Sequence, residues 1–409
     1  MKALLPLMGE ARSSVREGFL EALHRSLEEP ASYEDALTLS TARGSEVLLL
    51  LSAALAVKRR TSGDLITYSR KVFTPLTNLC RNRCTYCGFR RELGEAGAGF
   101  MGLEEAMKLV KLGERLGAKE VLVSTGERPE EAYGEARAML KSLGYSSTVE
   151  YVRVFEERVL EEAANMMPHT NIGVLSKSEM AELKPLNASM GLMLEVASGR
   201  LMGRGMPHER SPSKHPEARL RMIREAGELR IPFTTGVLIG IGETWEERIR
   251  SLMEIRRLHE EHGHIQEVIV QGFRPEPGTP MEGLKPPTPM EVAKTVALAR
   301  LIFHGEVSVQ APPNLSPEAL DLLLLSGLQD WGGVSPLTPD YVNPRYPWPK
   351  IPELKAATEA QGFKLRERLP IYPRYVRLGG SFIPEPLKER IYRLTDEEGL
   401  VKEELQGGP

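Results

Sequence analysis

Strand-like and helix-like segments alternate along most of this 409-residue chain, and this alternation limits its fold more than any other feature. Five stretches carry an apolar stripe opposite charged residues, as helices lying on a sheet do: residues 103–117, 148–163, 216–230, 245–261 and 289–303. Seven short runs are typical of strands, several of them apolar throughout as in strands covered on both faces: residues 71–77, 120–125, 170–176, 188–195, 233–242, 267–273 and 306–312. The pattern predicts an α/β fold with a parallel sheet. The strand number favours a closed (β/α)8 TIM-type barrel over the alternative, an open doubly wound sheet.

The two ends of the chain lack this alternation. Residues 12–58 have the apolar spacing of two or three helices, so we assign residues 1–65 to an N-terminal helical extension. Residues 66–350 form the predicted barrel. Residues 351–409 form a C-terminal extension that packs on the barrel or trails from it, and no clear linker separates independent domains.

Composition excludes several classes of protein. A hydrophobic content of 41%, a charged content of 27% and a net charge of -3 are those of an ordinary globular protein. The charge argues against a broad nucleic-acid-binding surface. The most apolar run, residues 47–57, is about half as long as the ~20 residues that cross a membrane. We expect a cytoplasmic protein without nucleic-acid or membrane partners.

All three cysteines of the chain fall within eight positions, at Cys80, Cys84 and Cys87. An odd number cannot pair fully as disulfides, and C-x3-C-x2-C spacing indicates a metal site one ligand short. A 4Fe-4S cubane needs one external ligand on each iron, so three cysteines leave one iron open. The alternatives are structural zinc, for which the first downstream histidine is His169, and chance clustering. The triplet follows the first predicted strand, and catalytic residues of barrels lie at such strand ends.

This loop resembles the cluster loop of the radical S-adenosylmethionine (SAM) superfamily, in which an aromatic residue precedes the last cysteine, as Tyr86 does here. The resemblance implies that Cys80, Cys84 and Cys87 hold a 4Fe-4S cluster whose open iron binds SAM. It also implies a 5'-deoxyadenosyl radical, formed with one electron from a donor such as flavodoxin or ferredoxin. The cofactor then carries the difficult chemistry, and no side chain is assigned as the catalyst.

Two glycine-containing strand ends match further elements of the superfamily. Gly126 and Glu127 end the second predicted strand, where a Gly-Glu element binds the methionine amino group of SAM. Gly240 and Ile241 lie in "GVLIGIGET", which resembles the element along the adenine ring. An ordinary strand-to-helix turn would also account for Gly126 and Glu127, and tight helix packing would also account for the glycines of the second element.

A carboxylate and an arginine complete the SAM contacts that the resemblance implies. Glu195 closes the fourth predicted strand and matches a carboxylate that contacts SAM. Arg219 is the best match for an arginine that pairs with the SAM carboxylate, with Arg221 and Arg224 as alternatives. A solvated helix face would equally explain any of the three arginines.

Longer stretches resemble one family within the superfamily, the radical SAM subunit (CofG type) of 7,8-didemethyl-8-hydroxy-5-deazariboflavin synthase. The resemblance runs from about residue 65 to 350 and includes "SRKVFTPLTNLCRNRCTYCGF", "GERPEEA", "MPHTNIGVLS", "HIQEVIVQGFRPEPGTPM", "VQAPPNLSP" and "DWGGVSPLTPDYVNP". One departure is Gly272, where the family usually has asparagine.

The resemblance implies a carbon-nitrogen lyase. Its substrate would be the adduct 5-amino-5-(4-hydroxybenzyl)-6-(D-ribitylimino)-5,6-dihydrouracil, which it would cyclise to the deazaflavin with release of ammonia, 5'-deoxyadenosine and methionine. A sister radical SAM subunit would supply this adduct, because the chain has one cysteine triplet. The alternatives are a sibling enzyme, such as the tyrosine-using subunit or a menaquinone-pathway cyclase, and a non-catalytic metal-binding barrel.

Candidate contacts to such a substrate lie at the later strand ends. Gln271, Gln310 and Asn314 offer the paired donors and acceptors that a uracil edge needs. Phe273 or Trp331 would provide a flat apolar wall for a phenol ring. Each of these residues would equally suit a core or a loop.

Four more polar residues have both a functional and a structural interpretation. Asp330 or Ser335 would bind ribityl hydroxyls. Arg274 would anchor the substrate or form an ion pair, and His169 would accept a proton or serve as a structural histidine.

Overall fold

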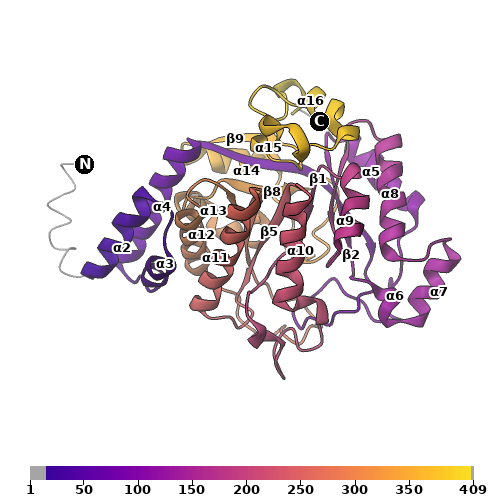
Figure 1. The fold of residues 1–409 in the computed structure, drawn as a ribbon, viewed down its shortest axis with the longest axis horizontal. Helices are drawn as coiled ribbons and strands as arrows, with labels where there is room; N and C mark the ends of the chain where they lie inside the picture. The colour runs from indigo at the N-terminus through magenta and orange to yellow at the C-terminus, as the bar shows by residue number, and fades with distance from the viewer. Residues whose placement is uncertain (1–14, 407–409) are drawn as a thin grey trace.

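The computed structural model describes residues 15–406, which form a parallel β-barrel surrounded by helices (Figure 1). Its strands follow the order β2-β3-β4-β5-β6-β7-β8-β1-β9, and a further pairing of β2 with β1 closes the first eight into a ring. They are β1 (Leu65–Thr77), β2 (Glu120–Thr125), β3 (Met167–Asn171), β4 (Ser189–Gly191), β5 (Phe233–Ile239), β6 (Ile265–Gly272), β7 (Ser308–Gln310), β8 (Asp330–Val334) and β9 (Lys364–Arg368). The predicted TIM-type barrel is confirmed, and the open sheet is excluded.

Helices, five of which the amphipathic stretches predicted, surround the ring. They are α5 (Leu103–Arg115), α6 (Pro129–Ala132), α7 (Gly134–Ser142), α8 (Thr148–Glu162), α9 (Lys177–Leu183), α10 (Pro216–Glu228), α11 (Trp245–His262), α12 (Pro289–Phe303), α13 (Leu320–Leu325) and α14 (Ile351–Ala360). Three of them, α9, α11 and α12, begin with a capping box, in which a Ser or Thr and a Glu satisfy free backbone N–H groups. Within residues 15–406 no helix is long and apolar enough to cross a membrane.

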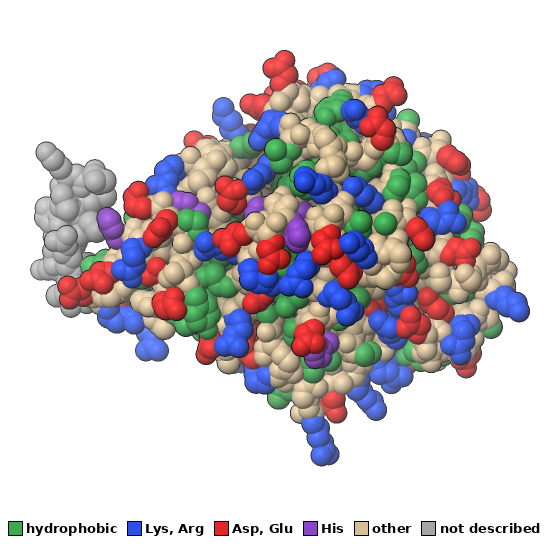
Figure 2. Space-filling view, in the orientation of Figure 1, with side chains coloured by type: hydrophobic (Ala, Val, Ile, Leu, Met, Phe, Trp, Pro, Cys, Tyr) green, Lys and Arg blue, Asp and Glu red, His purple; other side chains and the backbone are tan. Residues whose placement is uncertain are grey.

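The outer surface of these helices carries charges of both signs. Figure 2 shows Lys and Arg side chains interspersed with Asp and Glu side chains over the visible face. Along α11 the charges form ion pairs one helical turn apart, for example Arg250 with Glu246 and Arg256 with Glu260. Such exposed pairs stabilise a helix by only a few tenths of a kcal/mol each, roughly 0.3–0.5.

The N-terminal segment is helical, as predicted, and belongs to the same core as the barrel. It forms α2 (Glu17–Glu28), α3 (Tyr33–Ser40) and α4 (Ser45–Ser62). Helix α4 packs against α12 and buries Leu50, Ala54 and Val57 completely. Part of the predicted extension, residues 1–14, lies outside the described residues.

The C-terminal segment covers the amino-terminal end of the barrel. Strand β9 pairs with the first half of β1, and α15 (Pro373–Leu378) and α16 (Glu385–Leu394) follow it (Figure 1). Leu369, Ile371 and Tyr375 of this segment form an apolar cluster with Met167, at the start of β3. This cluster closes one end of the barrel, so ligands have to approach the interior from the other end.

The sequence patterns missed β8, β9 and the helices α6, α7, α9 and α13–α16, and they misplaced β3. The strand predicted over residues 170–176 lies at Met167–Asn171, because Ile172 and Leu175 are buried by packing rather than by strand pairing. Strand β8 contains Gly332 and Gly333, which weaken a strand pattern. A Cβ atom on these glycines would lie 2.1 Å from Gln310 and 2.3 Å from Lys71, so both glycines make room for side chains of the barrel interior.

A buried carboxyl group lies between α8 and the barrel. The Glu156 side chain is fully buried, and it bonds to Thr170 and, at 2.7 Å, to Nδ2 of Asn187. Burial raises the pKa of Glu156 to about 8. A protonated Glu156 donates to the Thr170 hydroxyl, which then donates to Oδ1 of Asn187 at 2.8 Å, so every group in the trio is satisfied.

We expect this carboxyl group to make stability fall as the pH rises. Because the folded state holds the proton more tightly than the unfolded state, its contribution is complete below about pH 4.5 and is lost through about pH 8. Urea unfolding of the wild type should show a loss of roughly 2–4 kcal/mol over this range relative to Glu156→Gln. Parallel pH profiles for the two proteins would contradict the assignment.

Candidate active site

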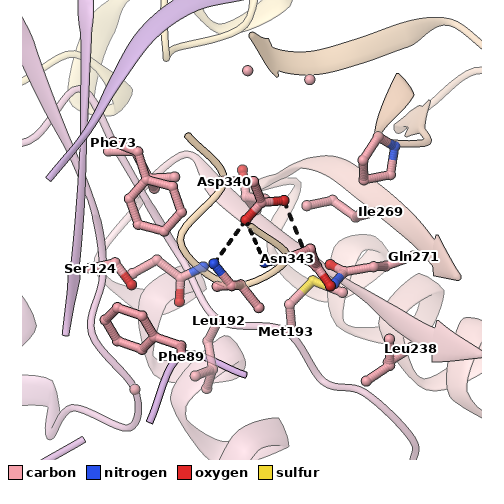
Figure 3. A pocket seen from close by; sticks show the side chains of 18 of the residues that line it. Phe73, Phe89, Ser124, Leu192, Met193, Leu238, Ile269, Gln271, Asp340 and Asn343 are labelled. Carbon is pink, nitrogen blue, oxygen red and sulfur yellow. Dashed lines mark hydrogen bonds between the residues drawn. The ribbon is translucent and has the colours of Figure 1, made fainter. Parts of the chain in front are cut away.

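One cavity of about 340 Å³ occupies the barrel interior and reaches the loops at the carboxyl ends of the strands. Its middle layer is apolar and includes Phe73, Leu122, Leu192, Leu238 and Ile269. Figure 3 shows the apolar side chains of Phe73, Leu192, Leu238 and Ile269 together with Phe89 and Met193, and Asp340 hydrogen-bonded to Asn343 among them. Below this layer lie polar residues that we call the floor: Lys71, Glu120, His169, Glu267 and Gln310.

The three cysteines line the upper end of this cavity, in a loop (residues 78–89, the cysteine loop) that directly follows β1. Backbone N–H groups of Asn82 and Glu127 donate to Cys80 Sγ at 3.4 and 3.1 Å. The Ser211 hydroxyl donates to Cys84 Sγ at 3.3 Å. Donors of this kind stabilise a thiolate, which is the form of cysteine that binds metal.

The three thiols line one cavity, as the ligands of a cluster would. No three His, Cys, Asp or Glu side chains within residues 15–406 converge closely enough to hold one metal ion. In a cubane each thiolate binds a different iron, so three thiols around a shared space are what such a cluster needs. Burial raises the pKa of Cys80 to about 12, and burial also raises the pKa of Cys87. A bound metal centre would lower the pKa of these buried thiols, because it stabilises the thiolate form.

Gly126 and Glu127 lie directly beside the cysteine loop. The Gly126 N–H donates to Thr77 O at 2.6 Å, and a Cβ atom on Gly126 would lie 1.9 Å from the carbonyl oxygen of Leu79. The buried Glu127 carboxylate accepts from Arg81 at 2.8 Å and from Asn82 at 3.1 Å. Packing against the cysteine loop therefore requires a glycine at position 126.

Glu195 forms a charged group with Lys214 and Arg219 on another wall of the cavity. Glu195 has a φ of 66°, a strained value for a residue other than glycine. It pairs with Lys214, and Arg219 Nη1 lies 3.9 Å from its Oε1. Burial opposes ionisation of Glu195, but the two cations outweigh burial and lower its pKa. Two cations against one carboxylate leave a positive charge that fits a ligand carboxylate.

The structure distinguishes among the three candidate arginines. Arg219 is buried and lines the cavity. Arg221 is exposed, and Arg224 pairs with Glu261 outside the cavity. Lys214, which the sequence patterns did not single out, joins Arg219 at the site.

Tyr86 lines the cavity, whereas Gly240 and Ile241 lie beside it. The Tyr86 hydroxyl is 2.9 Å from Nε2 of His208. The N–H groups of Gly240 and Ile241 donate to the Glu243 carboxylate at 2.8 and 2.9 Å, and Gly240 has a φ of 91°. Ile241 packs in a small apolar cluster against which Tyr86 also lies.

Only some of the predicted substrate contacts reach the cavity. Gln271, Gln310 and His169 line it. Phe273 is buried in the small apolar cluster with Ile241. Asn314 lies behind the cavity wall, where its Nδ2 donates to Asp340 at 2.9 Å and to the carbonyl oxygen of Tyr346.

The remaining predicted contacts are engaged with other parts of the protein. Trp331 is fully buried, and its indole N–H donates to Thr358 at 3.1 Å. Asp330 is also fully buried and accepts two bonds from Arg368, at 2.7 and 2.8 Å. Arg274 bonds the carbonyl oxygen of Leu315 and pairs with Glu318 at 2.8 Å. Ser335 accepts from the N–H of Thr338 at 2.8 Å and so fixes a turn.

The sequence patterns missed several residues of the cavity wall that a simple periodicity marks. Alternate residues of a barrel strand face inward, and on β2 these are Glu120, Leu122 and Ser124. On β6 the same periodicity selects Glu267, Ile269 and Gln271. Inward-facing residues of several strands combine into each interior layer. The alternation along the strands therefore accounts for both the polar floor and the apolar layer.

Replacing Gly126 by alanine should separate β2 from the cysteine loop. Its Cβ atom would overlap the backbone of Leu79, and overpacking of this kind costs about 1–3 kcal/mol. We expect a lower melting temperature and a smaller iron content per chain after anaerobic reconstitution. Gly134→Ala is the matched control, since its nearest neighbour would lie 3.8 Å away. A Gly126→Ala protein with wild-type iron content would contradict the packing argument.

Comparison with known proteins places these features in a family. The profile of the Radical SAM superfamily matches residues 74–255. A 7,8-didemethyl-8-hydroxy-5-deazariboflavin synthase from Methanopyrus kandleri is 55% identical over 83% of this chain and 100% of that protein. The FO synthase of Streptomyces coelicolor is 44% identical over 92% of this chain but only 43% of its own length.

Solved structures show the same fold. The FeFe-hydrogenase maturase HydG from Carboxydothermus hydrogenoformans superimposes with a TM-score of 0.72 at 20% identity, over 99% of this chain and 90% of that chain. An identity of 20% supports only a shared barrel fold. The 55% identity to the synthase supports membership of the same family. The chain therefore belongs to the 7,8-didemethyl-8-hydroxy-5-deazariboflavin synthase family of radical SAM proteins.

Proposed function

We propose that this chain forms the 7,8-didemethyl-8-hydroxy-5-deazariboflavin ring system by cyclising the hydroxybenzyl–ribitylaminouracil adduct with loss of ammonia. The observation that carries the proposal is the 55% identity to a synthase of that name along its whole length. The cavity is compatible with this reaction, because three unpaired thiols lie above a compartment with apolar walls.

Cys80, Cys84 and Cys87 would hold a 4Fe-4S cluster, and with SAM this cluster would supply the radical that abstracts a hydrogen atom from the adduct. The side chains of this protein bind and orient the reactants. Lys214 and Arg219 provide positive charge for the carboxylate of the methionine moiety, and Glu195 and Glu127 provide acceptors for its ammonium group.

The apolar layer of the cavity would hold the flat part of the substrate. Phe73, Phe89 and Leu122 offer surfaces against which aromatic rings pack, and they exclude water from a reactive radical. Gln271, on the inward face of β6, provides a donor and an acceptor for a uracil edge.

The proposal includes partners. A second radical SAM chain would supply the adduct, in agreement with the single cysteine triplet and with the greater length of the Streptomyces coelicolor FO synthase. A flavodoxin or ferredoxin would deliver the electron. A cytoplasmic location belongs to the proposal, because cysteines that bind a metal centre have to remain reduced.

An anaerobic assay tests the reaction. The reconstituted protein is incubated with SAM, dithionite and the synthetic adduct, and we expect a fluorescent deazaflavin together with 5'-deoxyadenosine and methionine. Formation of 5'-deoxyadenosine without the deazaflavin would contradict the proposal and would favour a sibling radical SAM activity.

Cys84→Ala should abolish both cluster assembly and SAM cleavage while the barrel remains folded. The thiol lies in a loop and accepts one hydrogen bond, from Ser211, so its removal affects little of the core. Iron analysis, circular dichroism and 5'-deoxyadenosine release measure the three properties. SAM cleavage at the wild-type rate in this variant would refute the cluster assignment.

A further inference from the structure

The floor of the cavity contains charged groups that none of the functions above uses. Strand register brings them together: Lys71 on β1 pairs with Glu120 on β2, and Thr234 on β5 pairs with Glu267 on β6. His169 and Gln310 complete the floor from β3 and β7. The floor lies at the end of the cavity opposite the thiols, next to the C-terminal segment at Arg368 and Pro370.

Lys71 is a buried cation without a hydrogen-bonding partner. Its side chain is only 7% exposed and lines the cavity. Within residues 15–406 its ammonium group forms no hydrogen bond or ion pair, and it lies 4.5 Å from the ring centre of Trp348. Burial lowers the pKa of Lys71, and the nearby carboxylates Glu120, Asp340 and Glu267 oppose this shift. An ammonium group needs hydrogen-bond acceptors when it leaves water, so a ligand has to provide them.

Acceptors without a complete set of donors surround this cation. The buried Oε1 of Gln310 has no hydrogen-bond partner among the described residues, while its Nε2 donates to the carbonyl oxygen of Trp331 at 3.3 Å. The Glu120 carboxylate is likewise without a hydrogen bond within residues 15–406. Glu267 accepts one bond, from Thr234 at 3.1 Å, and burial raises its pKa to about 7.

His169 adds a further acceptor. The Ser189 hydroxyl donates to the carbonyl oxygen of Pro370 at 2.8 Å and lies 2.6 Å from Nδ1 of His169. Nδ1 is therefore the donor to Ser189. Burial lowers the pKa of His169 to about 4, so its ring is neutral at pH 7 and its Nε2 carries a lone pair.

This set of groups suits a chain of hydroxyl groups. Each hydroxyl both accepts and donates, so successive hydroxyls can accept from Lys71 and donate to Glu120, Gln310 and His169. A uracil edge offers too few N–H donors for three separate acceptors. The apolar layer above the floor suits flat rings, which places a polar tail below them.

We propose that the floor binds the ribityl chain of the substrate, with Lys71 as a donor to its hydroxyls and Glu120, His169 and Gln310 as acceptors. This inference rests on the proposed function and adds an orientation to it. The ring system lies between the thiols and the floor, with the ribityl chain pointing toward the C-terminal segment. Residues of β1, β2, β3 and β7 would therefore bind the ribityl chain. Asp330 and Ser335, the residues expected from the sequence, bond to other groups of the protein.

A pair of ligands isolates the contribution of the ribityl chain. Binding of 7,8-didemethyl-8-hydroxy-5-deazariboflavin and of its N10-methyl counterpart to the reconstituted holoenzyme is measured by fluorescence titration. A hydrogen bond to a charged group corresponds to a change in affinity of about tenfold or more. We expect Lys71→Met to weaken the ribityl compound by about tenfold or more and the methyl compound by less than about twofold.

Two further variants complete the test. Glu120→Gln keeps the side-chain shape but replaces one acceptor oxygen by a donor, so it should also weaken the ribityl compound selectively. Lys355→Met is the matched control, because its ammonium group is exposed on α14, and it should leave both affinities unchanged.

Three results would overturn the inference in different ways. Equal weakening of both compounds by Lys71→Met would place Lys71 against the rings. No change with either compound would show that Lys71 contacts neither. If the wild-type holoenzyme binds neither compound, the proposed function itself fails, and the orientation fails with it.

Discussion

The pairing of β1 with β2, β8 and β9 holds the barrel and its site together. This strand is 13 residues long, and it pairs with β8 and β9 along its first half and with β2 along its second. The β1–β2 ladder closes the ring, and the cysteine loop begins where β1 ends. Hydrogen bonding of one strand therefore determines both the shape of the interior and the position of the thiols above it.

The barrel interior changes in character along its axis. Backbone N–H groups and cations gather near the thiols, where anionic groups would need stabilisation. Apolar side chains fill the middle, and the floor combines a cation with several acceptors. A buried charge without a partner destabilises a protein by several kcal/mol, roughly 3–5. Groups that remain unpaired in such a place are better explained by ligand binding than by stability.

Much of the fold follows from sequence periodicity. The helices on the barrel surface and the longer strands β1, β2, β5 and β6 carry clear patterns, because each buries one stripe or both faces. The patterns at residues 188–195 and 306–312 located β4 and β7 but overestimated their lengths, since each strand has three residues, and the two glycines of β8 weaken its pattern. Their places in the ring depend on tertiary packing, which a local pattern does not record.

The site was predictable to different degrees. Cysteine spacing and the strand-end position of Gly126 and Glu127 identified the upper end of the cavity. Polar residues after the later strands were less informative, since Asp330 and Arg274 satisfy their charges within the protein. The sequence gives no sign that Arg368 comes from 38 residues further along the chain to pair with Asp330. Lys71 stands two residues before Phe73, and only the alternation of inward-facing residues along β1 marks it as part of the cavity.

The apolar cluster that closes the amino-terminal end of the barrel also determines where reactants enter and products leave. Because Leu369, Ile371 and Tyr375 cover that end, reactants and products use the same opening of the cavity, at the cysteine loop. Under the proposed orientation, a substrate whose ribityl chain lies at the floor enters through this opening before SAM binds above it.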